Sequence, residues 1–493
     1  MGGGHVSRPD FGMPQPDPAH PLTEFYCLLQ RALDREGVFA LPALYAQFRA
    51  PARRIYADEA GNVIMRKPAT PGMKDRKGII LQAHMDMVPQ KNNDKTFDFT
   101  KDPIEAYIDG EWVTANGTTL GADNGMGLAA ILAVMGSKTL KHGPLEALIT
   151  ASEETGMDGA FGLKPGVLQG DILLNLDSEA EGELYVGCAG GLDLNVSLTY
   201  KEEAVPAGLK PVKIEVKGLL GGHSGIEIIL ERGNANKIMA RLLLHAQKEF
   251  GLRLASIDGG GLRNAIPREA TAVALIPQEK LQTFGEMVKT FDTLICAELK
   301  GVDDGVTVTA GDTSMPASVM DTESQNRLLN AVQGCPNGVI RMSPSMPGLV
   351  QTSTNLARVV SENGTVRMQA LLRSSVDSEK EYLAETMTSV FTLAGAVVTP
   401  SGGYSGWNPN MDSPILKTMT ESYEALYGRK PAVMAIHAGL ECGILGGKYP
   451  NLDMISFGPT IRYPHSPDEK TEIASVGKFW DYLLHTLSHV PQR

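Results

Sequence analysis

The sequence predicts an α/β protein whose mostly parallel sheet is interrupted by a second domain of the α+β class. Three observations favour this fold class. Short apolar runs alternate with helix-like segments up to about residue 188 and again from about residue 403, and the stretch between them alternates apolar and polar residues. The length of 493 residues, with 42% hydrophobic residues, allows more than one hydrophobic core.

The first part of the chain contains signals of hairpins and buried strands. Residues 54–56 and 63–66 flank a Gly-Asn turn, and residues 106–108 and 112–114 flank Asp109-Gly110, so both pairs predict β-hairpins. Apolar segments predict buried strands at 78–83, 145–150 and 172–176 and a helix at 125–135. Strands that alternate with helices form a parallel sheet that is covered on both faces.

The pattern changes at Gly190-Gly191. Residues 192–200 alternate apolar and polar side chains, as a half-exposed antiparallel strand does. After Pro211 the predicted order is strand, helix, strand, strand, helix, strand, which is the open-faced βαββαβ arrangement. The elements that follow are predicted to be strands at 356–360 and 365–373 and a helix at 378–393.

The αβ pattern returns after the Gly-rich segment 401–404. It continues through a helix and two short apolar strands to a final helix that is predicted to start at Lys470. We therefore predict a disordered segment at 1–21, a discontinuous α/β domain at 22–188 and 403–493, and an inserted domain at 189–402.

Composition excludes several classes of protein. The formal charge of −12 argues against nucleic-acid binding, because phosphate binding needs a basic face. The five cysteines are far apart and form no C-x-x-C pair, which favours a reducing cytoplasm over a disulfide framework. No apolar run approaches the roughly 18 residues of a membrane span, and the N-terminus lacks a signal pattern. We expect a cytoplasmic protein that binds neither nucleic acid nor membrane.

Histidine and acidic residues follow several predicted strands at the point where each strand ends. The candidates, in chain order, are His84, Asp123, the pair Glu153 and Glu154, Asp177 and His465. Because the carboxyl ends of parallel strands meet at one edge of a sheet, these side chains can converge. Zinc takes imidazole and carboxylate ligands, and a hydrolytic zinc pair needs a bridging carboxylate. The ordered set therefore predicts a two-zinc hydrolase.

Each candidate also has a plain structural interpretation. An isolated Asp at a strand end is most often a turn former or a helix cap, and it has roughly a one in ten chance of metal binding. A lone histidine in a Pro-rich loop, such as His465, is usually only a loop residue, and Glu-Glu pairs commonly start solvated helices. The metal interpretation is favoured because so many of these residues fall at strand ends in one chain.

Asp86 and the Glu153-Glu154 pair are expected to assist the ligands. Asp86 lies two residues after His84, so its carboxylate can accept the second imidazole N–H and fix the tautomer. Glu153 and Glu154 point in different directions. One of them can bind metal while the other accepts a proton from the attacking water as general base.

Seven longer motifs carry a family resemblance. They are 81–92 (LQAHMDMVPQKN), 117–125 (GTTLGADNG), 156–163 (GMDGAFGL), 221–225 (GGHSG), 262–269 (LRNAIPRE), 436–443 (IHAGLECG) and 464–469 (PHSPDE). Through them, from about Gly61 to the C-terminus, the chain resembles the bacterial cytosolic aminoacyl-histidine dipeptidases. These enzymes belong to the two-zinc metallopeptidases, with peptidase T and aminoacylase.

The resemblance implies a two-zinc exopeptidase-like catalytic domain with a lid inserted in it. It implies the following roles: Asp123 bridges the metals, His84 and Asp177 complete one site, Glu154 and His465 complete the other, Glu153 is the general base, and Asp86 orients His84. It also implies two zinc ions, for which Co²⁺ or Mn²⁺ can substitute.

In the lid, the resemblance implies that His223 stabilises the oxyanion. In related dimeric enzymes this histidine comes from the neighbouring subunit. Asn264 and Arg373 would help to hold the substrate. The structural alternatives are a Gly-rich turn residue for His223 and a surface ion pair with Asp377 for Arg373. The implied substrates are Xaa-His dipeptides, including β-alanyl-histidine, and the implied assembly is a homodimer through the lid.

The N-terminus departs from the family pattern. Residues 1–50 do not match the usual opening helix, Ile-Pro-x-Pro-Ser turn and Glu-containing second helix. Altered splicing of the gene start or a frameshift is our hypothesis for this difference, and it would leave a catalytically impaired homologue.

Three rival functions are carried forward from the sequence. An N-acyl amino-acid deacylase would use the same two-zinc site, and a non-catalytic zinc-binding scaffold would follow if the N-terminal change cripples the fold. A dehydrogenase is disfavoured, because no apolar strand precedes the glycines of residues 125–130.

Overall fold

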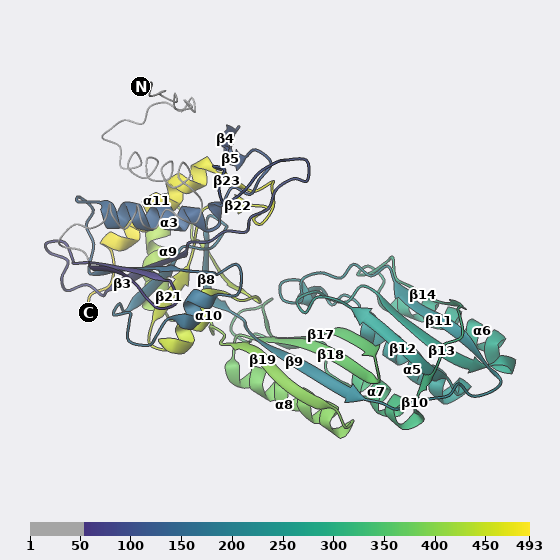
Figure 1. Ribbon diagram of the computed structural model, residues 1–493. Coiled ribbons are helices and arrows are strands. Elements are labelled where there is room, and N and C mark those ends of the chain that lie inside the picture. Colours follow the sequence, from purple (N-terminus) through teal and green to yellow (C-terminus); the bar gives the residue numbers. More distant parts are fainter. Residues whose placement is uncertain (1–53) are drawn as a thin grey trace. The chain divides into compact units, whose positions relative to one another are not determined.

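The computed structural model describes residues 54–493, which form two compact units (Figure 1). Unit 1 comprises the described residues up to Gly187, together with Asn410–Ala435 and Ile444–Arg493. Unit 2 comprises Cys188–Pro409 and Ile436–Gly443. Unit 2 thus extends beyond the predicted inserted domain and takes in a second short segment. The predictions for residues 1–21 and 22–50 lie outside the described residues.

Unit 1 is built on an eight-stranded sheet with the order β1-β2-β6-β3-β7-β21-β8-β20. The four central strands, β6, β3, β7 and β21, run parallel, and antiparallel strands flank them. The sheet is therefore mixed, and its parallel part is confined to the centre. The strands are β1 (Arg54–Ala57), β2 (Val63–Lys67), β3 (Ile79–His84), β6 (Leu145–Thr150), β7 (Ile172–Asn175), β8 (Glu183–Cys188), β20 (Ala432–Ile436) and β21 (Asp453–Ser456).

The central strands are short, mainly apolar segments that are buried on both faces. Every residue of β3, β6 and β7 is buried. Helix α3 packs on β3 and β6, and α9 packs on β21. The helices of unit 1 are α3 (Ala122–Gly136), α4 (Asp158–Gly162), α9 (Pro414–Tyr427), α10 (Glu441–Lys448, which begins in unit 2) and α11 (Ile473–Ser488). Burial on both faces is what a parallel sheet requires.

A four-stranded sheet of order β22-β23-β5-β4 supports the C-terminal loop of unit 1. Its strands are β4 (Ala106–Asp109), β5 (Trp112–Ala115), β22 (Ile461–Arg462) and β23 (Lys470–Glu472). The prediction that the last helix starts at Lys470 is wrong. Residues 470–472 pair with 112–114, and α11 begins only at Ile473. Residues 463–469 thereby become the loop of a short hairpin.

Unit 2 contains the predicted βαββαβ arrangement twice. The first copy is formed by β11 (Leu209–Lys217), α5 (Ala235–Phe250), β12 (Arg253–Gly260), β13 (Ala270–Pro277), α6 (Leu281–Glu298) and β14 (Thr307–Asp312). The second is formed by β9 (Gly190–Thr199), α7 (Thr322–Gly334), β17 (Val350–Glu362), β18 (Thr365–Ser374), α8 (Asp377–Leu393) and β19 (Val397–Tyr404). The first copy is inserted between β9 and α7 of the second.

The two copies share one sheet and one core. The spatial order β14-β11-β13-β12-β17-β18-β9-β19 joins them through antiparallel pairing of β12 with β17, the second strand of each copy. Helices α5, α7 and α8 contact one another in turn and cover one face of this sheet (Figure 1). Their apolar sides form a single buried cluster with the strands of both copies. None of the helices within residues 54–493 combines the length and the apolar composition that a membrane crossing requires.

Replacement of Gly127 by alanine tests how tightly α3 packs beside the end of β7. A Cβ atom at Gly127 would lie 2.2 Å from Asn124 Oδ1 and 2.5 Å from the carbonyl oxygen of Leu176. We expect Gly127→Ala to lower the thermal unfolding midpoint, because overpacking costs about 1–3 kcal/mol.

The matched control is Gly477→Ala in α11, where a Cβ atom meets nothing within 4 Å. This variant should gain up to about 1 kcal/mol, because alanine favours a helix more than glycine does. Equal increases in the midpoint for both variants would contradict the tight packing of α3.

Candidate metal centre

The carboxyl ends of β3, β6 and β7 deliver the predicted residues to one edge of the unit 1 sheet. His84 is the last residue of β3, and Asp177 lies just beyond the end of β7. Glu153 and Glu154 lie in the turn that follows β6, where Ser152 adopts a left-handed backbone with φ 57°. Asp123 lies in the first turn of α3, and His465 comes from the hairpin loop 463–469 with φ 60°. Non-glycine residues with positive φ are strained and concentrate at functional sites.

Asp123 lies between two pairs of side chains. Its Oδ1 is 3.1 Å from Nε2 of His84, and that nitrogen is 3.3 Å from Oδ1 of Asp177. Its Oδ2 is 3.2 Å from Nε2 of His465, which is 3.1 Å from Oε2 of Glu154. Each oxygen of the Asp123 carboxylate therefore faces a different histidine–acid pair.

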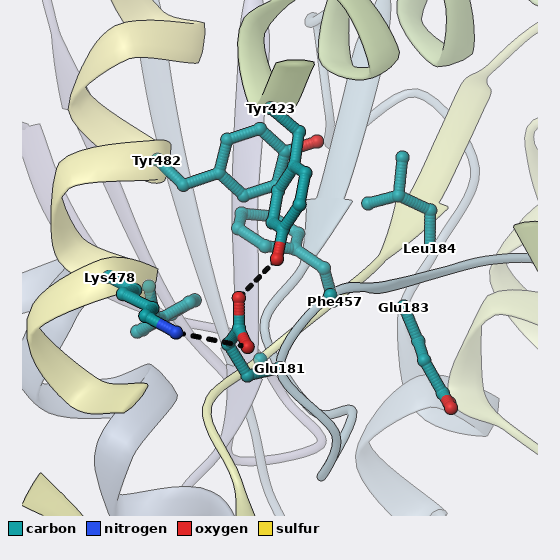
Figure 2. A pocket seen from close by; sticks show the side chains of 10 residues that line it. Glu181, Glu183, Leu184, Tyr423, Phe457, Lys478 and Tyr482 are labelled. Carbon is teal, nitrogen blue, oxygen red and sulfur yellow. Dashed lines mark hydrogen bonds and ion pairs between the residues drawn. The ribbon is translucent and has the colours of Figure 1, made fainter. Parts of the chain in front are cut away.

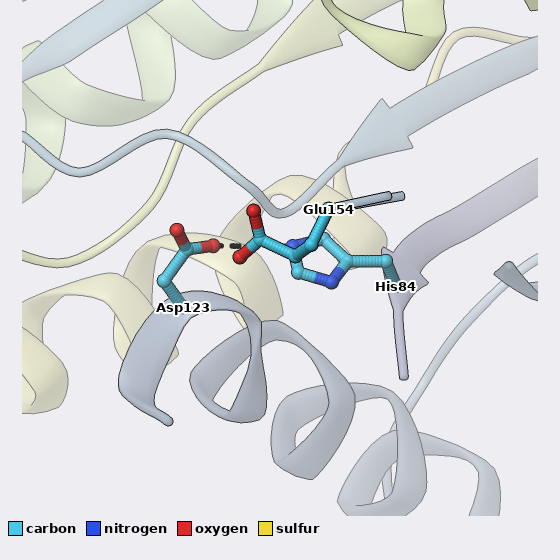
Figure 3. Close-up of side chains that lie close together, drawn as sticks. All are labelled: His84, Asp123 and Glu154. Carbon is cyan, nitrogen blue, oxygen red and sulfur yellow. Dashed lines mark hydrogen bonds and ion pairs between the residues drawn. The ribbon is translucent and has the colours of Figure 1, made fainter. Parts of the chain in front are cut away.

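The donor set fits a pair of divalent cations. One ligand atom from each of His84, Asp123 and Glu154 lies within 4.8 Å of the other two (Figure 3). The side chains of Asp123, Glu154 and Asp177 are only 8–10% exposed, and no lysine or arginine of residues 54–493 pairs with them. Oε1 of Glu154 is buried without a hydrogen-bond partner among the described residues. Three buried acids share only two histidines, and a bound metal would compensate their charge directly.

The acids also alter the acid–base behaviour of both imidazoles. Hydrogen bonds to Asp123 and Glu154 raise the pKa of His465 to about 10. Burial lowers the pKa of His84, but the charge of Asp177 and hydrogen bonds to the acids outweigh it and raise that pKa well above its usual value. Without a cation, His465 is therefore protonated at neutral pH, and the acids favour the protonated form of His84. Metal binding requires neutral imidazole, so it would compete with these protons.

Asp86 contacts the second ring nitrogen of His84 with its carboxylate, as predicted, and with its main-chain oxygen. Nδ1 of His84 lies 2.9 Å from the main-chain oxygen of Asp86 and 3.4 Å from its Oδ1. The Asp86 carboxylate accepts hydrogen bonds from the backbone amides of Glu153, at 3.0 Å, and Glu154, at 3.1 Å. Asp86 thus fixes the turn that carries both glutamates, and its main chain, rather than its side chain, is the nearer partner of His84.

Two residues beside the centre were missed in the sequence. The side-chain amide of Asn124 donates to Oδ1 of Asp177, and its carbonyl accepts the Gly127 amide at 3.1 Å. The peptide bond between Asp123 and Asn124 is cis. Burial, together with the charges of Asp123 and Asp177, raises the pKa of Glu179 to about 8. Only adjacency to predicted ligands could have indicated either residue.

The three residues predicted in the lid lie in unit 2. The loops carrying His223 and Asn264 run side by side, since the Ser224 amide donates to the carbonyl of Asn264 at 2.8 Å. Asn264 is exposed and Arg373 is 5% exposed. Arg373 Nη1 lies 3.4 Å from the hydroxyl of Tyr404, and no ion pair with Asp377 forms.

His437 lies near Arg373, since a Cβ atom on Gly225 would contact both residues. It was not singled out in the sequence, although motif 436–443 contains it. Its Nε2 lies 2.7 Å from Oγ of Ser353, and its Nδ1 has no partner among the described residues. Burial and the charges of Arg373 and His223 lower the pKa of His437 to about 3, so the ring is neutral.

A separate pocket of unit 1 is lined by residues of β8, α9 and α11 and by the segment that follows β21 (Figure 2). Four of its lining side chains are aromatic: Tyr423, Phe457, Phe479 and Tyr482. The carboxylate of Glu181 accepts the hydroxyl of Tyr423 and lies 3.5 Å from Nζ of Lys478. Because this acid is already paired, the pocket lacks the uncompensated charge that marks the centre around Asp123.

Histidine–acid pairs on both sides of a shared carboxylate, at one edge of a mixed sheet, are typical of metal-dependent hydrolases. Residues 80–489 match the family model described as peptidase family M20/M25/M40. The chain is 47% identical over 436 residues to the cytosol non-specific dipeptidase of Escherichia coli (strain K12), which covers 88% of this chain and 90% of that protein.

Solved structures agree with the sequence match. The aminoacylhistidine dipeptidase from Vibrio alginolyticus matches with a TM-score of 0.91 at 45% identity, over 96% of this chain and 97% of that one. The aminopeptidase PepT from Bacillus cereus shares the fold, with a TM-score of 0.54 at 16% identity over 95% and 97% of the two chains.

The chain belongs to peptidase family M20/M25/M40. It is a hydrolase of the metallopeptidase class. The family resemblance and the fold class predicted from the sequence are confirmed.

The two sides of Asp123 predict how many metal ions each variant binds. Asp177→Ala removes an acid from one pair only, so we expect about one bound zinc per chain. Asp123→Ala removes the shared carboxylate, and we expect it to retain less than one. Elemental analysis after equilibration with zinc and gel filtration measures these ratios.

The control is Asp98→Asn, which changes an acid that binds Lys101 on the surface. It should bind as much zinc as the wild type. Full zinc content in Asp123→Ala would contradict the bridging geometry.

Proposed function

We propose that this chain is a zinc-dependent dipeptidase that hydrolyses dipeptides with a free carboxylate, with a preference for Xaa-His substrates such as β-alanyl-histidine. The observation that carries the proposal is the Asp123 carboxylate, whose two oxygens lie 3.1 Å from His84 and 3.2 Å from His465. Co²⁺ or Mn²⁺ is expected to substitute for zinc, since imidazole and carboxylate donors accept all three.

His84, Asp123, Glu154, Asp177 and His465 would hold two zinc ions, which would supply Lewis-acid chemistry toward a water molecule and the scissile carbonyl. Glu153 accepts the proton of the attacking water and delivers it to the leaving amine. The backbone amides of Glu153 and Glu154 donate hydrogen bonds to the Asp86 carboxylate, which keeps the base and its neighbour in fixed orientations.

The substrate contacts come from unit 2. In the proposal His223 donates a hydrogen bond to the oxyanion of the tetrahedral intermediate. Its Nδ1 accepts the amides of Gly225 and Ile226 at 3.2 and 3.1 Å, so Nε2 is left to carry the proton. Arg373 binds the substrate carboxylate, which a planar guanidinium can hold through two hydrogen bonds, and Asn264 assists.

The names of the relatives bear on substrate and location. One is named a cytosol non-specific dipeptidase and the other an aminoacylhistidine dipeptidase. On this basis we propose dipeptides as substrates and a cytoplasmic location.

The homodimer through the lid remains a prediction. A Cβ atom on Gly225 would lie 3.0 Å from His223 and 3.1 Å from Arg373, so one chain brings these two residues together.

Replacement of Glu153 by alanine tests the proposed base. We expect Glu153→Ala to bind zinc like the wild type and to lower kcat by about 10²–10⁴-fold, the usual contribution of a positioned base. Zinc content and turnover of β-alanyl-histidine are measured on the same preparation. Retention of wild-type kcat would remove Glu153 from the mechanism.

The role of Arg373 is tested with paired substrates. Arg373→Met should lower kcat/KM at least about tenfold for a dipeptide, because a charge-assisted hydrogen bond contributes about 1.5–3 kcal/mol. The corresponding dipeptide amide lacks the carboxylate, so its kcat/KM should change little.

N-acetyl amino acids serve as the comparison substrate, and faster cleavage of these than of any dipeptide would indicate a deacylase instead.

A further inference from the structure

Glu469 lies at the base of the hairpin loop that carries His465, and its carboxylate contacts the turn that carries Asp123. Oε2 accepts the backbone amides of Leu120, at 2.8 Å, and Gly121, at 2.9 Å. Oε1 accepts the backbone amide of Asp123 at 3.1 Å. The residue is 2% exposed. One buried carboxylate therefore joins two segments that are about 350 residues apart.

The turn needs this partner because it cannot satisfy its own donors. The first amides of a helix have no partner within the helix, and a side chain at the N-cap usually accepts one of them. The N-cap of α3 is Gly121, which has no side chain and a φ of 75°. Asp123 and Asn124 have non-helical backbone angles, so this turn is irregular, and Glu469 supplies the acceptor for its amides.

The main chain of Glu469 is also fixed. Its amide donates to the carbonyl of Ser466 at 3.0 Å, and its carbonyl accepts the hydroxyl of Thr114 at 2.8 Å. Residues 470–472 follow immediately as β23 and pair with β5. The carboxylate is thus held on a strand at one end and on the Asp123 turn at the other.

We propose that Glu469 is a positioning residue of the metal centre, which sets the distance between Asp123 and His465. This inference rests on the proposed metal-binding function. Asp123 must keep one oxygen near His84 while the other stays 3.2 Å from His465. Because Glu469 is four residues from His465 and bonds directly to the Asp123 amide, a shift of either segment is transmitted to the other.

Glu146 provides a matched control. Its carboxylate also accepts two backbone amides, those of Gln169 at 2.6 Å and Gly170 at 2.7 Å, and it is 6% exposed. It pairs with Arg66 near the start of β6, at the opposite end of the strand from Glu153 and Glu154. Glu146 is therefore a buried carboxylate of the eight-stranded sheet of unit 1, and it accepts backbone amides away from the metal centre.

The test compares Glu469→Gln, Glu469→Asp and Glu146→Gln. Glutamine keeps the shape of Glu469, but its amide NH2 replaces one carboxylate oxygen. Either the Asp123 amide or the amides of Leu120 and Gly121 then lose their acceptor. Aspartate keeps the charge but is too short to reach both ends. Zinc affinity of the metal-stripped proteins is measured by competition with a chromophoric chelator, and the visible absorption of the Co²⁺-loaded proteins reports the coordination geometry.

We expect Glu469→Gln to weaken the binding of at least one zinc ion by about 10–100-fold, the range seen when a partner of a metal ligand is lost. Its Co²⁺ absorption should change, and Glu469→Asp should lie between it and the wild type. Glu146→Gln should lower the thermal midpoint of the metal-stripped protein without changing zinc affinity.

Unchanged zinc affinity and Co²⁺ absorption in Glu469→Gln would overturn the inference and leave Glu469 as a helix cap only. If that variant does not fold, wild-type zinc affinity in Glu469→Asp overturns the inference equally. Failure of the wild type itself to bind zinc would instead remove the proposed function. The two failures are therefore distinguishable.

Discussion

The candidate metal centre depends on the convergence of Asp123, Glu154 and Asp177 at one edge of the unit 1 sheet. Their side chains are only 8–10% exposed, although like charges repel and burial disfavours the ionised form. Two imidazoles lie among them, and their raised pKa values show how strongly the acids attract positive charge. Such a cluster is unfavourable for folding alone, and divalent cations remove the conflict because they compensate the charge directly.

The candidate ligands lie on turns that are held in place by other carboxylates, which accept backbone amides. Asp86 bonds the amides of Glu153 and Glu154, and Glu469 bonds those of the turn before Asp123. A backbone amide is a better anchor than a flexible side chain, because its position is set by the strand or helix that contains it. Both turns are thereby tied to the ends of other elements, which keeps the ligand atoms in place before any metal binds.

The sequence predicted the central strands well, and it placed the candidate metal ligands at their ends, because both depend on local signals. Unbroken apolar runs identify buried strands, and His84 and Asp177 stand directly where two of them end. The misses involve long-range partners. Residues 470–472 form a strand only because residues 112–114 pair with them, and Glu469 acquires its role from amides about 350 residues away. No periodicity within a short window contains either relation.

The second copy of the βαββαβ arrangement was missed for a related reason. Its first strand, β9, is separated from α7 by the whole of the first copy, so the repeat has no fixed period along the chain. In the sheet, however, corresponding strands β12 and β17 pair antiparallel, as equivalent strands do across a two-fold axis. The copies have diverged in what they carry: the first supplies His223, and the second supplies Arg373 on β18. Residues of both copies nevertheless meet within one chain, since His223 and Arg373 both lie close to Gly225.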